Sequence, residues 1–476
     1  MRIATFAVAI CLWLLGAKAI QAQVTWKTEI VDPGAVSNSY TSLGVGRDGT
    51  LHVAYRKSTS AWYAVKRAGA WTTERIPYST DVSMTVYQIA LVLDHDDQPH
   101  VAFSMFYDGD DYTPAYVRYA KKTSGTWSVA TISGCSIYGE IGGLELALDS
   151  RGCPAFVFIA TDWCGGDGVK YAYPTGVDCQ EWDVENVMPA SCLNNQFTAS
   201  LAFDAFDEPH VCLGCSQVPL QYASRSNAGW SFENIRPGSE GLSRGGSLKF
   251  DSRGDPNVVF LSVAGVDVGY SVKRNGAWTS ELVDTPGNAS PHVESLVLDS
   301  QERPHFWYVK WSGSNRDVHY ALKRGSQWIT SDVDTVNNFR GTASIELDGG
   351  GLPWIAYAGV GGVRVASVST VIERAKTDGV TAISEALELR VLPNPSVHGG
   401  VEIVYSGHLA QSVTVRIYDT SGRIVRTLLD GSESGTGGSV AWDGRDSQGR
   451  LAAAGAYFVQ ARSDRGTRTE RVIVLR

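Results

Sequence analysis

The stretch Ser295-Leu296-Val297-Leu298-Asp299, followed by Pro304-His305-Phe306-Trp307-Tyr308, decides the fold because it recurs along the chain. Two apolar segments around a short turn are typical of adjacent antiparallel strands. A divergent first copy has Gly46 and Leu51 in the places of the aspartate and the proline. The other copies centre on Asp94 with Pro99, Asp149 with Pro154, Asp204 with Pro209, Asp251 with Pro256, and Asp348 with Pro353.

The spacing of the copies gives the size of the repeated unit. Successive copies are 47 to 55 residues apart, which is the length of one four-stranded propeller blade. A tryptophan also opens the last strand of six units. These tryptophans are Trp71, Trp127, Trp182, Trp230, Trp278 and Trp328.

The unit at Asp348 lacks this tryptophan, whereas Trp26 precedes the first unit without a unit of its own. The segment 24–30 around Trp26 matches the segment 70–76 closely. We therefore expect strand 24–31 to pair with strand 363–368, which would leave no exposed sheet edge at the junction. The sequence predicts an all-β chain with a seven-bladed β-propeller over residues 23–370, closed by its N-terminal strand.

Several repeated side chains are expected to be structural. The repeated aspartate is expected to accept backbone N–H bonds in the turn after the innermost strand, and the proline to begin the second strand. The repeated tryptophans are interpreted as wedges between outer strands. A histidine follows Leu51 or the proline in four copies, and a position shared among blades indicates a scaffold role. These histidines are His52, His100, His210 and His305.

Composition and the N-terminus indicate the compartment. A chain of 476 residues is expected to form two or more domains, and its net charge of −9 argues against a nucleic-acid partner. Residues 1–22 are typical of a signal peptide, because Arg2 precedes an apolar run and small residues precede Ala22. A retained membrane anchor is the alternative. We expect a monomer that is secreted or lies on the outer cell surface.

The C-terminal part of the chain has a different pattern. The segment Val391-Leu392-Pro393-Asn394-Pro395 opens it, and an alternating strand at 413–418 leads into a turn at 419–422. Further turn glycines are Gly444 and Gly449. These features predict a β-sandwich of about seven short strands over residues 389–476, with residues 371–388 as a linker.

Two resemblances follow from these motifs. The repeats over residues 24–370 resemble the sialidase-like (BNR-type) repeat propellers of secreted bacterial proteins, although the Asp-boxes of true sialidases are missing. This resemblance implies the architecture and no catalytic residue. The C-terminal segment resembles the sorting domains of type IX secretion cargo and the Ig-like module of flagellar hook-capping proteins. It implies export through the secretion machinery, with a plain stabilising sandwich as the alternative.

Candidate ligand-binding residues lie in the loops between the second and third strands, which share one face with the connections between blades. Aromatic side chains with polar neighbours in such loops suit sugar rings. The cluster 108–111 is expected to be a solvated acidic loop, with Ca²⁺ binding by its carboxylates as the alternative, and no cofactor is expected. These loop candidates are Tyr107, Asp108, Asp110, Tyr112, Trp163, Trp311, Asn315 and Arg316, with Phe106 alongside.

A second group is expected where the innermost strands begin, around the mouth of the propeller funnel. Acids and bases of an enzyme would be needed here, and Glu140, His292 and Glu294 are the set that fits. The binding candidates at the mouth are Arg244, His292, Glu294 and Arg340, and Tyr40, Tyr87 and Asn195 fall near them.

Three functions remain open from the sequence. The first is a secreted or surface binding protein for a glycan or an extracellular protein. The second is a glycan-active hydrolase or lyase with a carboxylate pair at the funnel mouth. The third is a structural interaction module without a small ligand. No motif for nucleophilic catalysis is present, so we lean against an enzyme.

The cysteines remaining after signal removal all lie between Cys135 and Cys215. In an oxidising compartment this clustering indicates local disulfides. Loop topology places Cys153 and Cys179 on one face of the third blade. The expected pairs are Cys153–Cys179, Cys135–Cys164 and Cys192–Cys215, of which the last two can exchange partners, with Cys212 free.

Overall fold

The structure of the chain is a computed structural model. It describes residues 20–35, 40–78, 84–107, 114–136, 142–160, 168–176, 179, 181–189, 198–215, 218–235, 243–262, 267–285, 296–312, 315–335, 339, 341–377, 380–383, 388–392, 396, 400–409, 413–431, 435–463 and 466–475.

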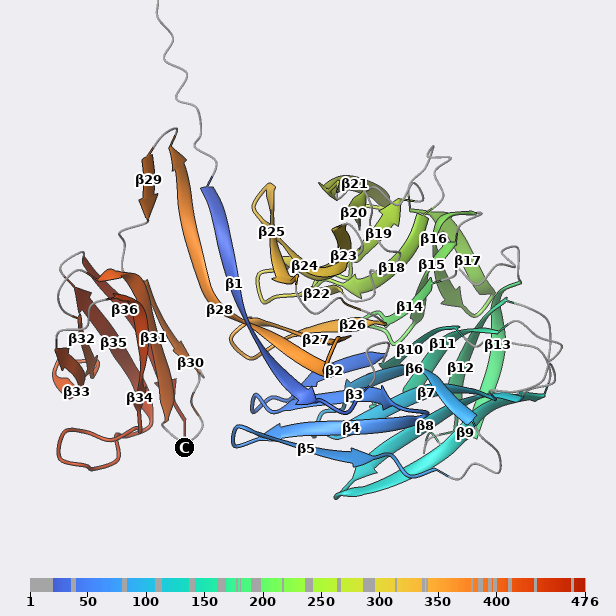
Figure 1. Ribbon diagram of the computed structural model, residues 1–476, viewed down its shortest axis with the longest axis horizontal. Helices are drawn as coiled ribbons and strands as arrows, with labels where there is room; N and C mark the ends of the chain where they lie inside the picture. The colour runs from blue at the N-terminus through green and yellow to red at the C-terminus, as the bar shows by residue number, and fades with distance from the viewer. Residues whose placement is uncertain are drawn as a thin grey trace, which may run out of the picture. The chain divides into compact units, whose positions relative to one another are not determined.

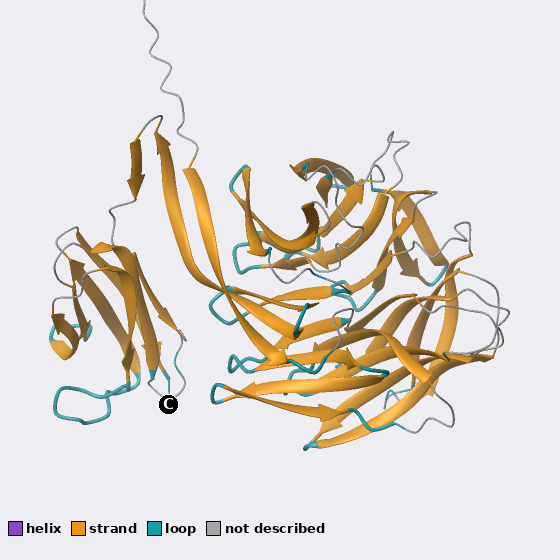
Figure 2. Cartoon of the chain, viewed as in Figure 1, coloured by secondary structure: helices purple, strands orange, loops and turns teal. Residues whose placement is uncertain are grey.

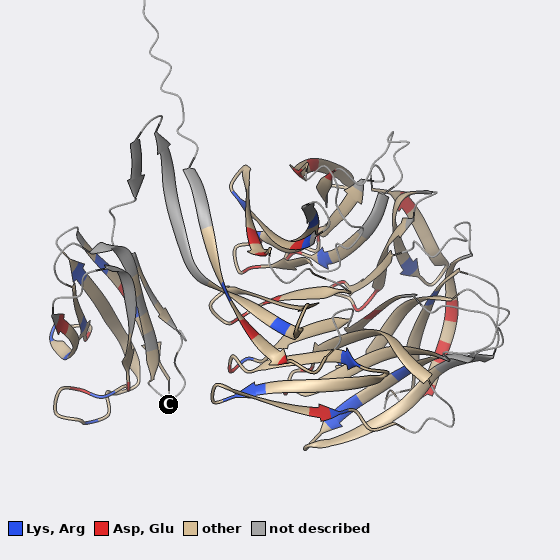
Figure 3. Cartoon of the chain, viewed as in Figure 1, with Lys and Arg blue, Asp and Glu red and all other residues tan. Residues whose placement is uncertain are grey.

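All regular structure in these residues is β-strand (Figure 2). The chain divides into two compact parts, one of residues Val24–Thr370 and one that includes Val371–Arg476. Acidic and basic residues are interspersed along the strands of both parts (Figure 3). Within the described residues, no helix is long and apolar enough to cross a membrane.

The strands of Val24–Thr370 form antiparallel sheets of four, in which each strand pairs with the next along the chain, as in propeller blades. The first three units are β2 (Thr41–Val45), β3 (Leu51–Lys57), β4 (Ser60–Arg67) and β5 (Ala70–Arg75); β6 (Met84–Leu93), β7 (Pro99–Tyr107), β8 (Pro114–Thr123) and β9 (Thr126–Ser136); and β10 (Gly142–Leu148), β11 (Pro154–Ala160), β12 (Gly168–Thr175) and β13 (Glu181–Pro189).

Units four to six follow the same order. They are β14 (Thr198–Phe203), β15 (Pro209–Cys215), β16 (Val218–Ser226) and β17 (Gly229–Asn234); β18 (Ser243–Phe250), β19 (Pro256–Ser262), β20 (Val268–Arg274) and β21 (Ala277–Asp284); and β22 (Leu296–Leu298), β23 (Pro304–Ser312), β24 (Asn315–Arg324) and β25 (Gln327–Asp334). The fourth and fifth units join into one sheet through the residue pair Cys215 and Ser243.

The last unit combines both ends of this part of the chain. Its sheet order is β26 (Ala343–Leu347), β27 (Pro353–Gly359), β28 (Gly362–Thr377) and then β1 (Ile20–Asp32), so the N-terminal strand lies beside β28 (Figure 1). Gly362 begins β28 at a φ of 117°, and a Cβ there would overlap the backbone of Asp32 at the end of β1. Glycine is therefore needed at this close contact between the two strands.

The innermost strands β2, β6, β10, β14, β18, β22 and β26 are in consecutive contact, and β26 also contacts β2. Side chains on these strands accept hydrogen bonds from backbone N–H groups of the next innermost strand. The Ser200 hydroxyl accepts from Leu248 at 2.9 Å, and the Ser247 hydroxyl accepts from Leu296 at 2.9 Å. Between β26 and β2, the Thr41 hydroxyl donates to the Thr342 carbonyl at 2.8 Å.

The repeated turn has the expected aspartate bonds. The Oδ1 atom of Asp299 accepts from the backbone N–H groups of Gln301 and Arg303, both at 2.9 Å. The Oδ1 atom of Asp94 accepts likewise from Asp96 and Gln98. Each carboxylate therefore satisfies two backbone donors of its own turn, which is the structural role predicted from the sequence.

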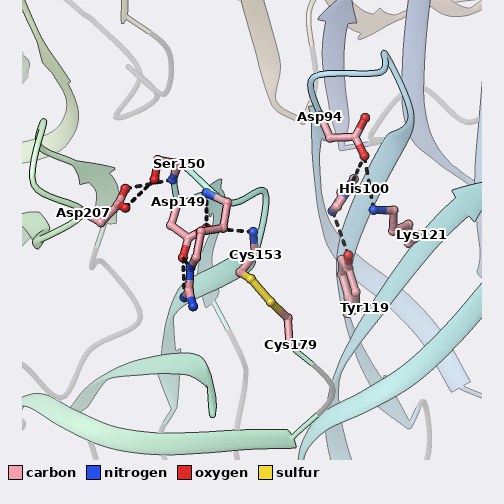
Figure 4. Close-up of a disulfide and its surroundings, with 10 residues drawn as sticks. Asp94, His100, Tyr119, Lys121, Asp149, Ser150, Cys153, Cys179 and Asp207 are labelled. Atoms are coloured by element: carbon pink, nitrogen blue, oxygen red, sulfur yellow. Dashed lines mark hydrogen bonds and ion pairs between the residues drawn. A yellow bond between two sulfur atoms is a disulfide. The ribbon is translucent and has the colours of Figure 1, made fainter. Parts of the chain in front are cut away.

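The repeated histidine has the expected structural position. His100 is fully buried, its Nε2 atom lies 3.2 Å from Asp94, and its Nδ1 atom lies 2.7 Å from the Tyr119 hydroxyl (Figure 4). Four tyrosine–histidine pairs of this kind occur in the described units: Tyr63 with His52, Tyr119 with His100, Tyr222 with His210, and Tyr320 with His305.

Glutamates on the outer strands link neighbouring units. Glu185 on β13 accepts from the Trp230 indole at 2.8 Å and pairs with Arg225 at 2.6 Å, both in the next unit. Glu29 on β1 makes the same contacts with Trp71 at 3.0 Å and Lys66 at 2.5 Å in the first unit. The N-terminal strand thus occupies the position of an outer strand.

The C-terminal part contains two further sheets. The first is β30 (Glu388–Leu392), β31 (Val401–Leu409) and β34 (Gly435–Trp442); the second is β33 (Ile424–Gly431), β32 (Val413–Tyr418), β35 (Gly455–Ser463) and β36 (Gly466–Val474). Alternate residues of β32 are buried, and they join a core around the buried Trp442 and Tyr457. The predicted alternation therefore produces one apolar face per sheet.

The interval 371–388 was expected to be a linker. In the structure β28 continues to Thr377, and β29 (Val380–Ile383) pairs back onto it from Arg374 onward. Most described residues of this interval therefore belong to paired strands.

Candidate functional site

Most of the predicted ligand-binding residues lie outside the described part of the chain. These residues are Asp108, Asp110, Tyr112, Trp163, His292, Glu294 and Arg340. The acidic cluster 108–111, with its alternative role in Ca²⁺ binding, and the catalytic candidate Glu140 lie outside the described part as well. For Tyr107 at the end of β7, Arg244 in β18, Trp311 in β23 and Asn315 in β24, the structure describes the backbone alone.

Arg316 is the loop candidate whose side chain is described, and it is half-buried at the start of β24. Its carbonyl oxygen accepts a hydrogen bond from the Phe339 N–H at 2.8 Å. Phe339 belongs to the connection that leads into β26. The contact supports the expectation that loops between second and third strands share a face with the connections between units.

A cluster of aromatic side chains lies on this face, where the first and second units meet. Tyr40 precedes β2, Tyr87 lies in the first half of β6, and Phe106 lies near the end of β7. The Tyr40 and Tyr87 rings are 5.2 Å apart, and the Tyr87 and Phe106 rings are 5.7 Å apart in an edge-on arrangement. All three are half-buried, so part of each ring remains accessible. We call these three residues the mouth cluster.

A buried guanidinium lies against the mouth cluster. Arg56 on β3 is 8% exposed, and its Nη1 atom donates to the Val86 carbonyl at 3.2 Å. Burial lowers the pKa of Arg56, and the Tyr40 and Tyr87 phenols act in the opposite direction. The strands of two units thus position a cation behind two phenol rings.

A cavity of about 150 Å³ lies between the innermost strands, and residues of all seven line it. Tyr40 of the mouth cluster is among them, so the cluster and the cavity are continuous. Lys249 on β18 and Glu346 on β26 bring opposite charges into the cavity. Burial raises the pKa of Glu346 to about 7, and the positive charge of Lys249 acts in the opposite direction. A carboxyl group with such a pKa can exchange protons near neutral pH.

Lys249 and Glu346 were not among the residues expected at the site, although the sequence carries a signal for them. Both residues stand two positions before the repeated aspartate. The corresponding residues of four other copies are small or apolar: Val92, Ala147, Ala202 and Val297. A charge at a position that is otherwise apolar in the repeats marks an exception to the scaffold.

Glu145 is the other carboxylate in the cavity lining. Its Oε2 atom accepts the Leu201 N–H at 3.0 Å, which is the bond that Ser200 and Ser247 make at other junctions. Glu145 therefore has a structural hydrogen-bond partner on β14. Glu346 is the cavity carboxylate whose pKa burial raises.

The disulfide Cys153–Cys179 is present, with the two Cα atoms 5.7 Å apart (Figure 4). It joins the turn before β11 to the turn before β13, so these turns share a face as expected. Cys212 is a free buried thiol, also as expected. The pairs Cys135–Cys164 and Cys192–Cys215 involve side chains outside the described part and stay predictions.

The chain was compared with known proteins. Residues 398–467 match the model of the FlgD Ig-like domain, which agrees with the Ig-like resemblance of the C-terminal segment. No curated protein matches the chain.

Solved structures with a similar fold share little sequence with the chain. AofleA from Arthrobotrys oligospora is 11% identical with a TM-score of 0.43, over 66% of this chain and 90% of that one. PorZ, a type IX secretion surface component of Porphyromonas gingivalis, is 13% identical with a TM-score of 0.31, over 93% and 71%. The GH93 α-L-arabinofuranosidase of Fusarium graminearum is 13% identical with a TM-score of 0.41, over 70% and 95%. At these values the likeness carries no conclusion about activity.

Proposed function

We propose that residues 24–370 form a seven-bladed β-propeller that binds a glycan outside the cytoplasm, and that the C-terminal domain directs its export. The observation that carries the binding function is the half-buried mouth cluster of Tyr40, Tyr87 and Phe106, which opens onto the central cavity.

The seven-bladed ring is supported by three kinds of contact at the junction of its ends. β1 is hydrogen-bonded to β28, and β26 contacts β2. Glu29 of β1 bonds to Trp71 of the first unit, as Glu185 does to Trp230 farther along the ring. A closed ring leaves no free sheet edge and so resists edge-to-edge aggregation.

The choice of a glycan is supported by the chemistry of the mouth cluster. The C–H faces of sugar rings pack against aromatic rings, and hydroxyl groups form hydrogen bonds with nearby polar groups. Tyr40 and Tyr87 supply both an apolar ring and a hydroxyl. The loop candidates Tyr107, Trp163 and Trp311 belong to the same predicted face and would extend this surface.

Secretion is supported by the signal-like residues 1–22 and by the Cys153–Cys179 disulfide, because disulfides persist in oxidising compartments. The Ig-like match at residues 398–467 supports an export or surface role for the C-terminal domain. Its partner would be the secretion machinery.

A second candidate, a glycan-active hydrolase, is favoured by one observation. Glu346 lies in the cavity with its pKa raised to about 7, which suits a general acid near neutral pH. Release of reducing ends from a bound glycan, abolished by Glu346→Gln, would establish this activity. Binding without release favours the binding protein.

The binding function is tested with a glycan array and the purified mature chain, residues 23–476. The Tyr87→Ala and Phe106→Ala variants should bind each glycan that the parent binds about tenfold more weakly, a change in binding free energy of ~1.4 kcal/mol. Phe206→Ala is the matched control, because Phe206 is 86% exposed on a turn after an innermost strand, away from the mouth. Equal binding by all variants would reject the mouth cluster as the site.

A further inference from the structure

The turn between β14 and β15 brings three metal-ligating side chains together in the fourth unit. Asp204, Glu208 and His210 each offer one ligand atom, and these atoms all lie within 4.8 Å of one another. Asp204 and His210 belong to the repeated scaffold. The fifth unit also has a carboxylate at the position of Glu208, Asp255, but it has Asn257 in place of the histidine, so the fourth unit alone combines the three side chains among the described residues.

The sixth unit provides an internal comparison for the position of Glu208. The residue four positions after the repeated aspartate is Arg303 there, and it pairs with Asp299 at 2.5 Å. In the fourth unit that position holds Glu208, so an attractive charge is replaced by a second carboxylate. Two carboxylates therefore face one histidine where the sixth unit has one carboxylate and a guanidinium.

The second unit supplies its cation from a different strand. Lys121, which lies opposite His100 on β8, pairs with Asp94 at 3.2 Å. The residue opposite His210 on β16 is Ser224, which carries no charge. Among the described residues, no lysine or arginine forms an ion pair with Asp204. In two further units the cation stands two positions after the aspartate, as Arg151 does for Asp149 and Arg253 for Asp251, where the fourth unit has Phe206. All three positions that neutralise the aspartate in other units therefore lack a positive charge in the fourth unit.

His210 has a ring nitrogen available for a ligand. Its side chain is 10% exposed, and its Nε2 atom is buried without a hydrogen-bond partner, 3.4 Å from Asp204. The corresponding atoms of His100 and His305 lie 3.2 Å from their aspartates within hydrogen-bond geometry. The Nδ1 atom of His210 lies 2.7 Å from the Tyr222 hydroxyl. An Nδ1–H donated to this oxygen leaves the Nε2 lone pair free, as in histidines that bind metals.

We propose that Asp204, Glu208 and His210 bind a divalent transition-metal ion, with zinc the best match, on the turn of the fourth unit. An imidazole nitrogen with carboxylate oxygens suits zinc, whereas Ca²⁺ prefers oxygen ligands alone. Three protein ligands leave coordination positions open to water or to a ligand group. The bound cation supplies the positive charge that Arg303 supplies in the sixth unit and Lys121 in the second.

The test uses the mature chain, freed of metal with a chelator, dialysed against Zn²⁺ and analysed for bound zinc. The Glu208→Arg variant copies the charge arrangement of the sixth unit and should therefore fold. The parent should retain one more zinc ion per chain than this variant. Glu208→Gln should lose this zinc as well. Equal zinc content in the parent and both variants, or none in the parent, would overturn the proposal.

A gain-of-site variant provides an independent measurement. Arg303→Glu places the same three side chain types around Asp299 and His305, and should add one zinc ion per chain. Arg303→Gln is its control, because it removes the ion pair without adding a carboxylate, and should add none. Zinc content unchanged in Arg303→Glu would show that these three side chains do not suffice, and would contradict the assignment.

Discussion

The Trp26 indole donates a hydrogen bond to the Ser331 hydroxyl at 3.0 Å, across 305 residues of sequence. The same indole packs edge-on against Tyr320, with ring centroids 5.1 Å apart. Equivalent indoles of later units pack on the tyrosine of the preceding unit, as Trp127 does on Tyr63. The N-terminal strand therefore contacts the sixth unit through its tryptophan and the first unit through Glu29 on the same strand.

We predict that Trp26→Ala lowers the free energy of unfolding by roughly 2–3 kcal/mol, because it removes a large half-buried ring. Trp26→Phe keeps a ring against Tyr320 and loses the bond to Ser331, so a loss of about 1 kcal/mol is expected. Deletion of residues 23–32 should leave the chain unfolded or aggregated. Urea unfolding measures all three, and a deletion variant that melts like the parent would reject closure by β1.

We predict that stability falls as the pH drops from about 6.5 to about 4. Burial lowers the pKa of His100 to about 4, with Asp94 acting in the opposite direction. The unfolded chain therefore binds a proton at this histidine at a higher pH than the folded chain does, and protonation favours unfolding. His52 has a similarly lowered pKa of about 4 and should add to the effect.

The His100→Asn variant isolates one histidine, since the fifth unit has Asn257 at the same position, bonded to Tyr270. The free energy of unfolding of the parent should fall between pH 7 and pH 4. In the variant this fall should be about 2–3 kcal/mol smaller. Chemical denaturation at several pH values measures this difference. An unchanged pH dependence would show that His100 is not held in its neutral form.

We predict that the Cys153–Cys179 disulfide contributes about 3 kcal/mol to stability, because it closes a loop with a sequence separation of 26. Replacement of both cysteines by alanine should lower the midpoint of chemical unfolding measured without reductant. Peptide mapping without reduction tests the pairs Cys135–Cys164 and Cys192–Cys215. A Cys153–Cys164 or Cys179–Cys192 link would contradict the assignment of loops to faces.

We predict that removal of residues 389–476 leaves a folded propeller that is not delivered to the cell surface. Residues Val24–Thr370 form a compact part by themselves, so the truncated chain should melt as the parent propeller does. Fractionation of host cells locates the protein. Normal surface delivery of the truncated chain would reject the sorting role, and loss of folding would reject the independence of the propeller.

The repeated framework could be predicted from the sequence alone, because its signals are local. Asp94 and Pro99 belong to one turn and the strand it begins, and the bonds that Asp94 accepts come from residues within the same turn. The pair Cys153–Cys179 could likewise be derived from loop topology. The two ends were linked by Trp26, which supplies the tryptophan that the last unit lacks, and by the match between segments 24–30 and 70–76. These signals are local because β1 takes the place of an outer strand in the last unit.

The candidate site depends on residues that only the tertiary structure brings together. Lys249 and Glu346 line one cavity because the innermost strands contact one another in succession, although 97 positions separate the two residues in the sequence. Arg56 meets Tyr40 within the first unit, where its backbone N–H donates to the Tyr40 carbonyl, but it meets Tyr87 of the second unit only through the tertiary structure. The contacts among the innermost strands join different units, and no local pattern of hydrophobicity encodes which side chains meet between units. The raised pKa of Glu346 is a consequence of burial among these strands, so it could be found only from the tertiary structure.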